Sequence, residues 1–535
     1  MTSTNISNGN CEGNSPGSHF SKAWTALLLL VLIWLGFALS AHISRPWVTA
    51  LGYNGAVWSQ AAHNVLRAGL VETSGASSGF YFGPLPIPPS GYYLHHPPLL
   101  HLILAGLFAI FGEHEWVARM VPITCSIVSA VLLWLLIRSC ASQRAATMSA
   151  AVFACLPMEL RYGKMVNFEP VVLMLMLGAL WSIRNWKLSS DVRWKAASVV
   201  FVVLGLWVDW AMYLFVAALW ICSLTRRDAR DRRFAVTLLV AALFSALLYL
   251  LRIRLLRSDA WTDLGHTFLY RVGCSSCFTE LDWIKRISSS LTTHFLPIGW
   301  LLAMIGSAII ICRNKQTEGL RWLGWTCGAI SLMDVMFLVA FQNDSYIHQY
   351  IGFYFLVPIA ALAGVALDQM ITGAENTFRT QASRSIVICM ACLLLVDLGV
   401  QGAGRAKSLE RQFQILDYKS PEPFNLIPDL GAAIQANFSQ DTPVLCNFLP
   451  NYGPQLQYYA QRDLLNNLSD YRSWERYLPG TPKRIGGVVW MGSQAARDIL
   501  AKVPAGTRRF VTFGKISFCF WKLSTDRVAA IQSPR

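Results

Sequence analysis

The sequence predicts a polytopic α-helical membrane protein that ends in a small α/β domain, and three observations predict it. Of the 535 residues, 54% are hydrophobic and only 14% are charged, and a mean hydropathy of +0.41 is too apolar for a soluble domain. Many apolar runs approach membrane-spanning length. After about residue 400, short strand-like runs alternate with helical patterns. We therefore expect a disordered Asn/Ser/Gly-rich tail over 1–22, a membrane domain over 23–400 and an extracytoplasmic α/β domain over 401–535.

The formal net charge of +15 first raises the question of a nucleic-acid partner. The basic residues, however, lie mostly in short loops between apolar runs, where the preference of Lys and Arg for the cytoplasmic side accounts for them. The partners we expect are membrane lipids and a membrane-borne substrate, and not nucleic acid.

The positions of the basic loops predict the topology, with about 11–12 helices. The first apolar run, 24–42, is long for a signal peptide, and we interpret it as an uncleaved anchor. With a cytoplasmic N-terminus, all later basic loops are cytoplasmic only if 99–111 does not cross, so we expect that segment to be re-entrant or interfacial. An outer N-terminus is the alternative. The other expected crossings are 116–138, 145–158, 166–183, 196–208, 210–224, 234–252, 295–312, 322–341, 348–369 and 383–400.

This topology gives the outer face a large first loop, 44–98, together with the C-terminal domain. Residues 53–69 have apolar positions at helical spacing, which indicates a helix lying on the membrane surface. Residues 73–91 are rich in Gly, Ser and Pro and predict an irregular loop. Pro97 and Pro98 then favour a helix start.

The order of these elements resembles a known superfamily of membrane enzymes. The first outer loop begins YNGAVWSQAAHNVL, continues to YYLHHPPLL, and is followed by FGEHEWVAR. This order resembles the polyprenyl-phosphate-sugar glycosyltransferases of the GT-C superfamily, the group of protein O-mannosyltransferases and the lipid A aminoarabinose transferase. Where the family has an acidic residue at the start of the loop, this chain has Asn54. The matching residues are Tyr92, His95, His96, Pro97, Pro98 and Leu99, then Phe111, Gly112, Glu113, Glu115, Trp116 and Arg119.

The resemblance implies a GT-C-like helical bundle that moves a sugar from a polyprenyl-phosphate-linked donor to an acceptor on the extracytoplasmic face. The acceptor class stays open between lipid, glycan and protein. A bacterial inner (plasma) membrane is the expected location, because no organelle signal is visible. The lack of a nucleotide-binding Gly-rich motif argues against a soluble sugar nucleotide as donor.

Such a site needs cations for the donor phosphate. Arg254 and Arg257 follow the 234–252 helix on its expected outer side and share a helix face, although snorkelling to lipid headgroups would explain them equally well. Other residues that we expect to bind substrate are Arg161, Lys164, Arg119, His95, His96 and His348. Each of them could instead have a purely structural role.

The site also needs a base to take the proton of the acceptor hydroxyl. Asn54 cannot serve, since an amide oxygen is barely basic, but it can still bind substrate. We expect Glu169, at a helix start, or Glu72, the one acid of the first loop up to Pro98, to be the catalytic base. Favourable charge at a helix N-terminus is the alternative for Glu169. Asp209 interrupts an apolar stretch at an outer turn and is expected near the pocket, unless turn formation alone explains it.

Two further questions stay open from the sequence. A divalent metal is possible as a cofactor, but no metal-ligand pattern identifies residues for one. A competing class of function is a catalytically inactive homologue, or a scaffold or transporter that binds lipid-linked sugars, and Asn54 keeps the scaffold alternative open. Transport ranks lower, because the polar residues gather at one membrane face and no internal repeat is visible.

Overall fold

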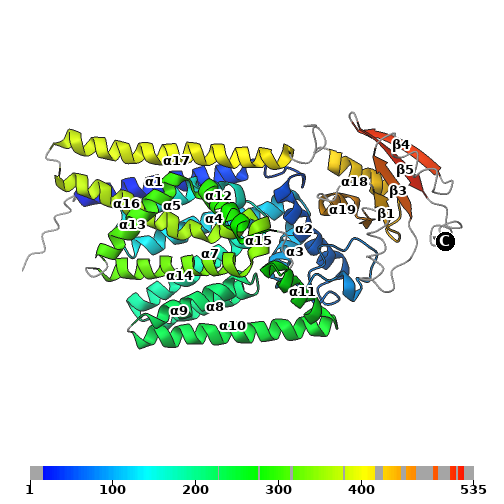
Figure 1. The fold of residues 1–535 in the computed structure, drawn as a ribbon, viewed down its shortest axis with the longest axis horizontal. Helices are drawn as coiled ribbons and strands as arrows, with labels where there is room; N and C mark the ends of the chain where they lie inside the picture. The colour runs from blue at the N-terminus through cyan, green and yellow to red at the C-terminus, as the bar shows by residue number, and fades with distance from the viewer. Residues whose placement is uncertain are drawn as a thin grey trace, which may run out of the picture.

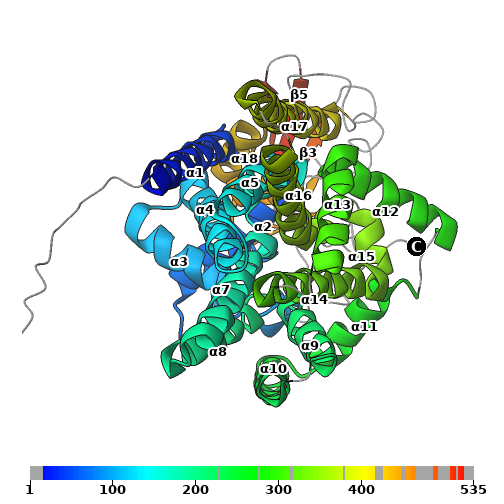
Figure 2. The ribbon, with the colours of Figure 1, turned by 90° about the vertical axis from the view of Figure 1, so that its left-hand side faces the viewer.

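Long helices run side by side along the long axis of the molecule in the computed structural model (Figure 1). The structure describes residues 16–226, 228–274, 278–313, 317–377, 380–415, 426–446, 453–465, 486–491, 507–513 and 516–522. The long helices are α1 (Pro16–Ser40), α4 (Glu115–Arg138), α7 (Phe168–Ser189), α10 (Ala229–Leu256), α14 (Glu318–Ala340), α16 (Leu356–Thr377) and α17 (Gln381–Ile415). Shorter helices complete the bundle, which Figure 2 shows end-on: α5 (Gln143–Cys155), α8 (Val192–Leu206), α9 (Ala211–Leu224) and α13 (Pro297–Arg313).

Seven helical segments in the described part of the chain are long and apolar enough to cross a membrane, which makes this an integral membrane protein. An eighth crossing results if α13 and the preceding α12 (Glu280–Phe295), which meet at 87°, form one broken span. This count is below the 11–12 expected. The difference lies mainly in α5, α8 and α9, whose 13, 15 and 14 residues fall short of the roughly 20 that a straight crossing needs.

The end of the bundle that carries the first loop is built from short elements. There lie α2 (Ala50–Ala68) and α3 (Leu99–Phe111), which pack against each other (Figure 1). The surface helix expected over 53–69 is present as α2, and Thr49 caps it by accepting a hydrogen bond from the Gly52 amide at 3.2 Å. With 13 residues, α3 is too short to count among the membrane-spanning segments. The other short elements are η1 (Pro89–Gly91), α6 (Pro157–Tyr162), α11 (Ala260–Val272), α15 (Gln342–Ile347) and η2 (Gln349–Phe355).

The C-terminal part carries α18 (Leu426–Asn437), α19 (Gly453–Ala460) and a five-stranded sheet of order β2-β1-β3-β5-β4. Strand β1 is parallel to β2 and β3, whereas β5 pairs antiparallel with β3 and β4. Helix covers both boundaries expected from the sequence, because α1 begins at Pro16 and α17 runs to Ile415; residues 1–15 lie outside the described part. The strands are β1 (Val444–Cys446), β2 (Leu464–Leu465), β3 (Gly487–Met491), β4 (Thr507–Phe513) and β5 (Ile516–Lys522).

The C-terminal part contacts α2 through α19. The Tyr459 hydroxyl accepts a hydrogen bond from the Trp47 amide at 2.7 Å and donates one to Glu115 at 2.6 Å. Trp47 in turn packs so closely on Gly55 that a Cβ there would lie 2.3 Å from the indole ring. Glycine is therefore required at this position, and α2 is fixed between the bundle and α19.

Candidate active site

A cavity of about 870 Å³ opens where the short elements meet the end of the bundle, and its size is typical of ligand sites. One wall is α2, and the opposite wall is formed by α11, α14 and the segment around α15. The polar residues that line it are Tyr53, Asn54, Tyr93, His95, His96, Asn167, Glu169, Asp209, Thr267, Arg271, Asp344, His348 and Tyr350.

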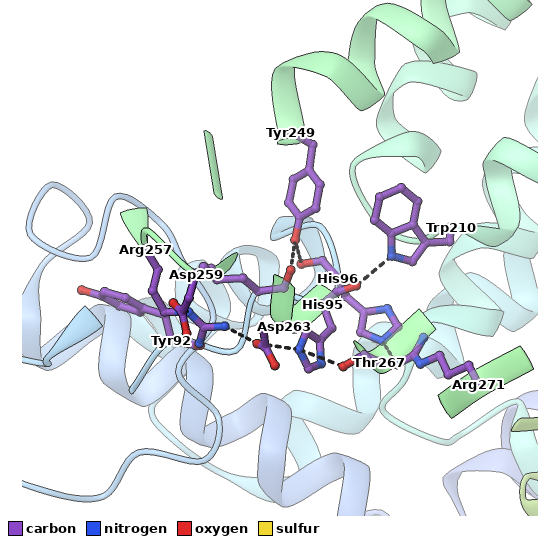
Figure 3. A network of polar contacts seen from close by, with 11 residues as sticks. Tyr92, His95, His96, Trp210, Tyr249, Arg257, Asp259, Asp263, Thr267 and Arg271 are labelled. Carbon is purple, nitrogen blue, oxygen red and sulfur yellow. Dashed lines mark hydrogen bonds and ion pairs between the residues drawn. The ribbon is translucent and has the colours of Figure 1, made fainter. Parts of the chain in front are cut away.

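The His-His-Pro-Pro segment is held by its backbone carbonyls. Tyr249 directs its hydroxyl at the carbonyls of Leu94 and His96, at 2.8 and 2.9 Å, and Trp210 donates its indole N–H to the His95 carbonyl at 2.7 Å (Figure 3). Because proline has no amide to donate, these side-chain donors fix the segment where backbone pairing is not available. Both imidazoles are consequently presented at the cavity.

His96 links two charged groups. Its Nδ1 lies 2.8 Å from Asp209 Oδ1 and its Nε2 lies 2.8 Å from an Arg271 guanidinium nitrogen. A guanidinium can only donate, so Nε2 must accept, and we assign the proton of a neutral His96 to Nδ1, which donates to Asp209. Burial and the neighbouring Arg271 lower the pKa of His96, which agrees with the neutral form.

His95 belongs to a separate ion-pair network on the α11 side. Its Nε2 lies 2.9 Å from Asp263 and 3.2 Å from the Thr267 hydroxyl, and Asp263 also pairs with Arg257 (Figure 3). The hydrogen bond with His95 and the charge of Arg257 lower the pKa of Asp263 to about 2. Arg257 also pairs with Asp259 at 2.9 Å, so its charge is already balanced by two carboxylates.

Arg271 is the only Arg or Lys among the described residues that line the cavity. It extends from the last turn of α11 and contacts Asp344 at 3.5 Å as well as His96. Neither Arg271 nor Asp344 was predicted from the sequence. The available signal was an arginine in the stretch between the expected crossings 234–252 and 295–312.

Glu169 has the one buried carboxylate oxygen lining the described cavity without a hydrogen-bond partner, namely Oε2. The side chain is 6% exposed and lies in the first turn of α7. Asp209, in contrast, is engaged at both oxygens, by His96 and by the Ala211 amide at 3.1 Å. Glu169 is therefore the carboxylate best placed to receive a proton.

The structure brings together six of the residues singled out in the sequence: Asn54, His95, His96, Glu169, Asp209 and His348. The Asn54 amide nitrogen lies 3.7 Å from Met165 Sδ, and His348 stacks on Tyr350 with 5.1 Å between ring centroids. Their order along the first loop and the outer ends of the helices was sufficient to group them.

Two expected phosphate ligands near α10 lie outside the cavity. Helix α10 ends at Leu256 and α11 folds back over it, with the Trp261 indole donating to the Leu250 carbonyl at 2.8 Å. Arg254 is consequently exposed and donates to the Ser258 carbonyl, and Arg257 is occupied by its ion pairs. It is α11, and not the end of α10, that covers the cavity.

Three other expected cations and one expected base are also elsewhere. Arg119 donates to the Ile43 carbonyl at 2.6 Å and lies over the Trp47 ring. Arg161 lies buried over the Tyr162 ring, and Lys164 points at the Ala41 carbonyl at 3.5 Å. Glu72 is exposed in the turn after α2 and does not line the cavity, so the structure does not support it as the base.

The donors in the cavity do not fit a divalent metal. No group of three or more His, Cys, Asp and Glu side chains is arranged to hold one in the described residues. Asn54 offers only a neutral amide, and Asp209 is already engaged by His96 and a backbone amide. The mechanism below therefore includes no metal-dependent step.

Comparisons with known proteins agree with this geometry. A sequence profile described as dolichyl-phosphate-mannose-protein mannosyltransferase matches residues 95–255, while no curated protein sequence matches significantly. Among solved structures, ArnT from Cupriavidus metallidurans bound to undecaprenyl phosphate has a TM-score of 0.58 at 13% identity, covering 97% of this chain and 100% of its own.

Two further structures share the fold. The oligosaccharyltransferase AglB from Archaeoglobus fulgidus, in complex with an inhibitory peptide and a dolichol-phosphate, has a TM-score of 0.57 at 13% identity, covering 94% of this chain and 74% of its own. Arabinofuranosyltransferase AftD from Mycobacteria has a TM-score of 0.51 at 12% identity, covering 95% of this chain and 40% of its own. The matching family profile and the shared fold support the resemblance drawn from the sequence to the GT-C superfamily of membrane glycosyltransferases.

Proposed function

We propose that this protein transfers a sugar from a polyprenyl-phosphate carrier to an acceptor hydroxyl on the extracytoplasmic face of the membrane. One observation carries the proposal: Arg271, the one Arg or Lys of the described lining, and a buried carboxylate oxygen without a partner, on Glu169, line the same largely apolar cavity. The undecaprenyl phosphate and dolichol-phosphate bound to two proteins of the same fold support a donor of this class.

The phosphate and the isoprenoid of the donor match a charged part and an apolar part of the cavity. Arg271 would hold the phosphate through its guanidinium, which Asp344 and His96 keep in place. The isoprenoid would lie along the apolar wall made by Leu214, Leu250, Leu264, Phe268 and Phe337, which come from α9, α10, α11 and α14. Asn54, His95 and His348, together with the rings of Trp58 and Tyr93, would contact the sugar.

The reaction then needs one proton transfer. Glu169 Oε2 takes the proton of the acceptor hydroxyl as the acceptor oxygen bonds to the anomeric carbon. The bond from that carbon to the phosphate oxygen breaks, and both its electrons leave with the polyprenyl phosphate. Arg271 stabilises the charge that develops on this leaving group.

The distribution of positive charge supports the extracytoplasmic face. Helix α4 starts beside Tyr459 and runs away from the cavity for 24 residues to Arg138. Basic residues also lie in the first turn of α5 (Arg144) and in the last turns of α7 (Arg184 and Lys187). By the positive-inside rule these ends are cytoplasmic, which leaves the cavity, α2 and the C-terminal part outside. We place the protein in a bacterial inner membrane and treat the part from α18 onward as a separate soluble unit.

The test compares Glu169→Gln with Glu72→Gln in the purified full-length protein, given a polyprenyl-phosphate sugar and a membrane extract as acceptor source. We expect the first variant to release polyprenyl phosphate about 10³-fold more slowly than the parent, and the second to match the parent. Parent-like turnover in Glu169→Gln would remove the base assignment.

A second candidate function is favoured by Asn54, which replaces an acidic residue of the family with a neutral amide. On that alternative the protein binds lipid-linked sugars without transferring them. A parent protein that retains the donor but releases no polyprenyl phosphate would favour this binding function over catalysis.

A further inference from the structure

A second, smaller pocket lies on the far side of α2's first turns from the catalytic cavity. It is bounded by the end of α1, the start of α4 and the loop that contains Lys164 and Met165. Met165 lines this pocket, and its sulfur lies 3.7 Å from the amide nitrogen of Asn54, which lines the cavity. The contact between Met165 and Asn54 therefore lies between the small pocket and the catalytic cavity.

The described lining of this pocket is rich in cations. Arg45, Arg119 and Lys164 line it together with a single carboxylate, Glu410, which pairs with Arg45 at 3.4 Å. A second carboxylate, Glu115, acts on Arg119 without lining the pocket, and it also accepts a hydrogen bond from Tyr459. Three cations thus face one lining carboxylate.

The hydrogen bonds of two of these cations do not neutralise their charge. Arg119 donates to the carbonyls of Ile43 and Arg45, and Lys164 points at the Ala41 carbonyl, all just beyond the C-terminal end of α1. Carbonyl oxygens at a helix C-terminus attract cations, but each carries only a partial charge. Burial lowers the pKa of Lys164, the charge of Glu410 raises it, and the charges of Arg119 and Arg45 lower it.

The pocket is positioned at the level of lipid headgroups. The membrane-spanning segment of α1 ends at Ser40, that of α4 begins at Glu115, and that of α17 ends at Glu410. A volume of about 30 Å³ is enough for about two water molecules or one tetrahedral anion, and too small for a sugar ring. Basic residues at this level attract anionic lipids.

We propose that the pocket formed by Arg45, Arg119 and Lys164 binds the phosphate of an anionic lipid headgroup. The site is distinct from the donor phosphate site at Arg271 and does not depend on the transfer reaction. A lipid bound there would lie one side chain away from Asn54, so its presence would also stabilise the start of α2.

The experiment uses the full-length protein purified in neutral detergent, with phosphatidylglycerol and phosphatidylcholine as probes and bound lipid counted by native mass spectrometry. We expect the parent to retain phosphatidylglycerol in preference to phosphatidylcholine. Lys164→Gln should weaken that binding about tenfold, a loss typical of one charge-assisted hydrogen bond. Arg254→Gln, which removes an exposed cation at the same end of the bundle, should bind like the parent.

The proposal is overturned by equal retention of both lipids by the parent, by unchanged phosphatidylglycerol binding in Lys164→Gln, or by an equal loss in Arg254→Gln. Lys164→Arg keeps the charge and should restore binding if Lys164→Gln is unstable; failure of this variant, when folded, also contradicts the site. Inorganic phosphate should compete better than chloride at equal ionic strength. Binding of inorganic phosphate without retention of phosphatidylglycerol would overturn the lipid assignment in favour of a free phosphate.

Discussion

Both faces of α2 carry polar side chains, yet they differ in how their polar groups are paired. On the face toward the C-terminal part, Gln60 donates to the Tyr81 carbonyl at 3.0 Å and accepts from Gln461 at 2.9 Å. Asn64 donates to the carbonyls of Ser78 and Tyr81. On the face toward the cavity, the Asn54 amide nitrogen lies 3.7 Å from the Met165 sulfur, and Asn54 lines the same cavity as Glu169, whose Oε2 has no hydrogen-bond partner.

This difference separates structural from functional polarity. A buried polar group with its hydrogen bonds made contributes modestly to stability, whereas one left without a partner costs about 1–3 kcal/mol. The burial of Gln60 and Asn64 is explained by their hydrogen bonds, which join α2 to the first loop and to Gln461. The unpaired Glu169 Oε2 has no such structural role. A buried polar atom that lowers stability is expected where catalysis requires it.

The largest effect is expected on the cavity side. Arg271→Gln removes the one Arg or Lys that lines the described cavity, and sugar transfer from a polyprenyl-phosphate donor should fall about 10²- to 10³-fold because the leaving phosphate loses its charge partner. Arg271→Lys keeps the charge but loses the fork geometry, and it should retain an intermediate rate. Steady-state release of polyprenyl phosphate measures both, and a parent-like rate in Arg271→Gln would place the donor phosphate elsewhere.

A smaller effect, on stability, is expected on the paired face. Asp463 is 9% exposed and interacts with Arg67 and Tyr81, and burial raises the pKa of its carboxyl to about 6. Because this folded-state pKa is above the ordinary value of 3.8, the carboxyl favours the folded state fully below about pH 4. That contribution is lost as the pH rises through about 6.

Asp463→Asn should remove this pH dependence. Relative to the parent, the variant should gain on the order of 1–3 kcal/mol at pH 8 and much less at pH 4. Thermal unfolding at the two pH values, with hydrogen exchange in α19 as a local probe, provides the measurement. An equal difference between the two proteins at both pH values would show that Asp463 does not titrate as described.

The smallest effect is expected from Tyr459→Phe. The change removes the hydroxyl that accepts from the Trp47 amide and donates to Glu115, and we expect a loss of about 1–2 kcal/mol in stability. Transfer activity should stay within a few-fold of the parent, since the hydroxyl is on the paired face of α2. A loss of activity as large as that of Arg271→Gln, in a folded variant, would contradict the distinction between the two faces.

The sequence was sufficient for the fold class and for the part of the site that its motifs carry. His95 and His96 follow from the His-His-Pro-Pro segment, and Glu169, Asp209 and His348 follow from expected outer ends of helices. Each of these could be placed by its own local sequence.

The cation that we propose to bind the donor phosphate could not be placed in the same way. Spacing predicts that Arg254 and Arg257 share a helix face, but α10 ends at Leu256, Arg257 has an extended backbone, and α11 folds back over α10. Arg271 can be identified as a residue of the cavity only when the packing of α11 is known. The expected number of 11–12 membrane-spanning helices stays a prediction, since seven described segments are long and apolar enough by themselves and α5, α8 and α9 are shorter.

Photolabelling tests most directly whether the cavity holds a lipid-linked sugar donor. A polyprenyl-phosphate analogue with a photoreactive group near the phosphate should label peptides from α11 and the start of α7, and unlabelled polyprenyl phosphate should compete. Labelling should fall in Arg271→Gln and persist in Tyr459→Phe. Labelling that leaves α7 and α11 unmodified, or that Arg271→Gln does not change, would contradict the proposed donor site.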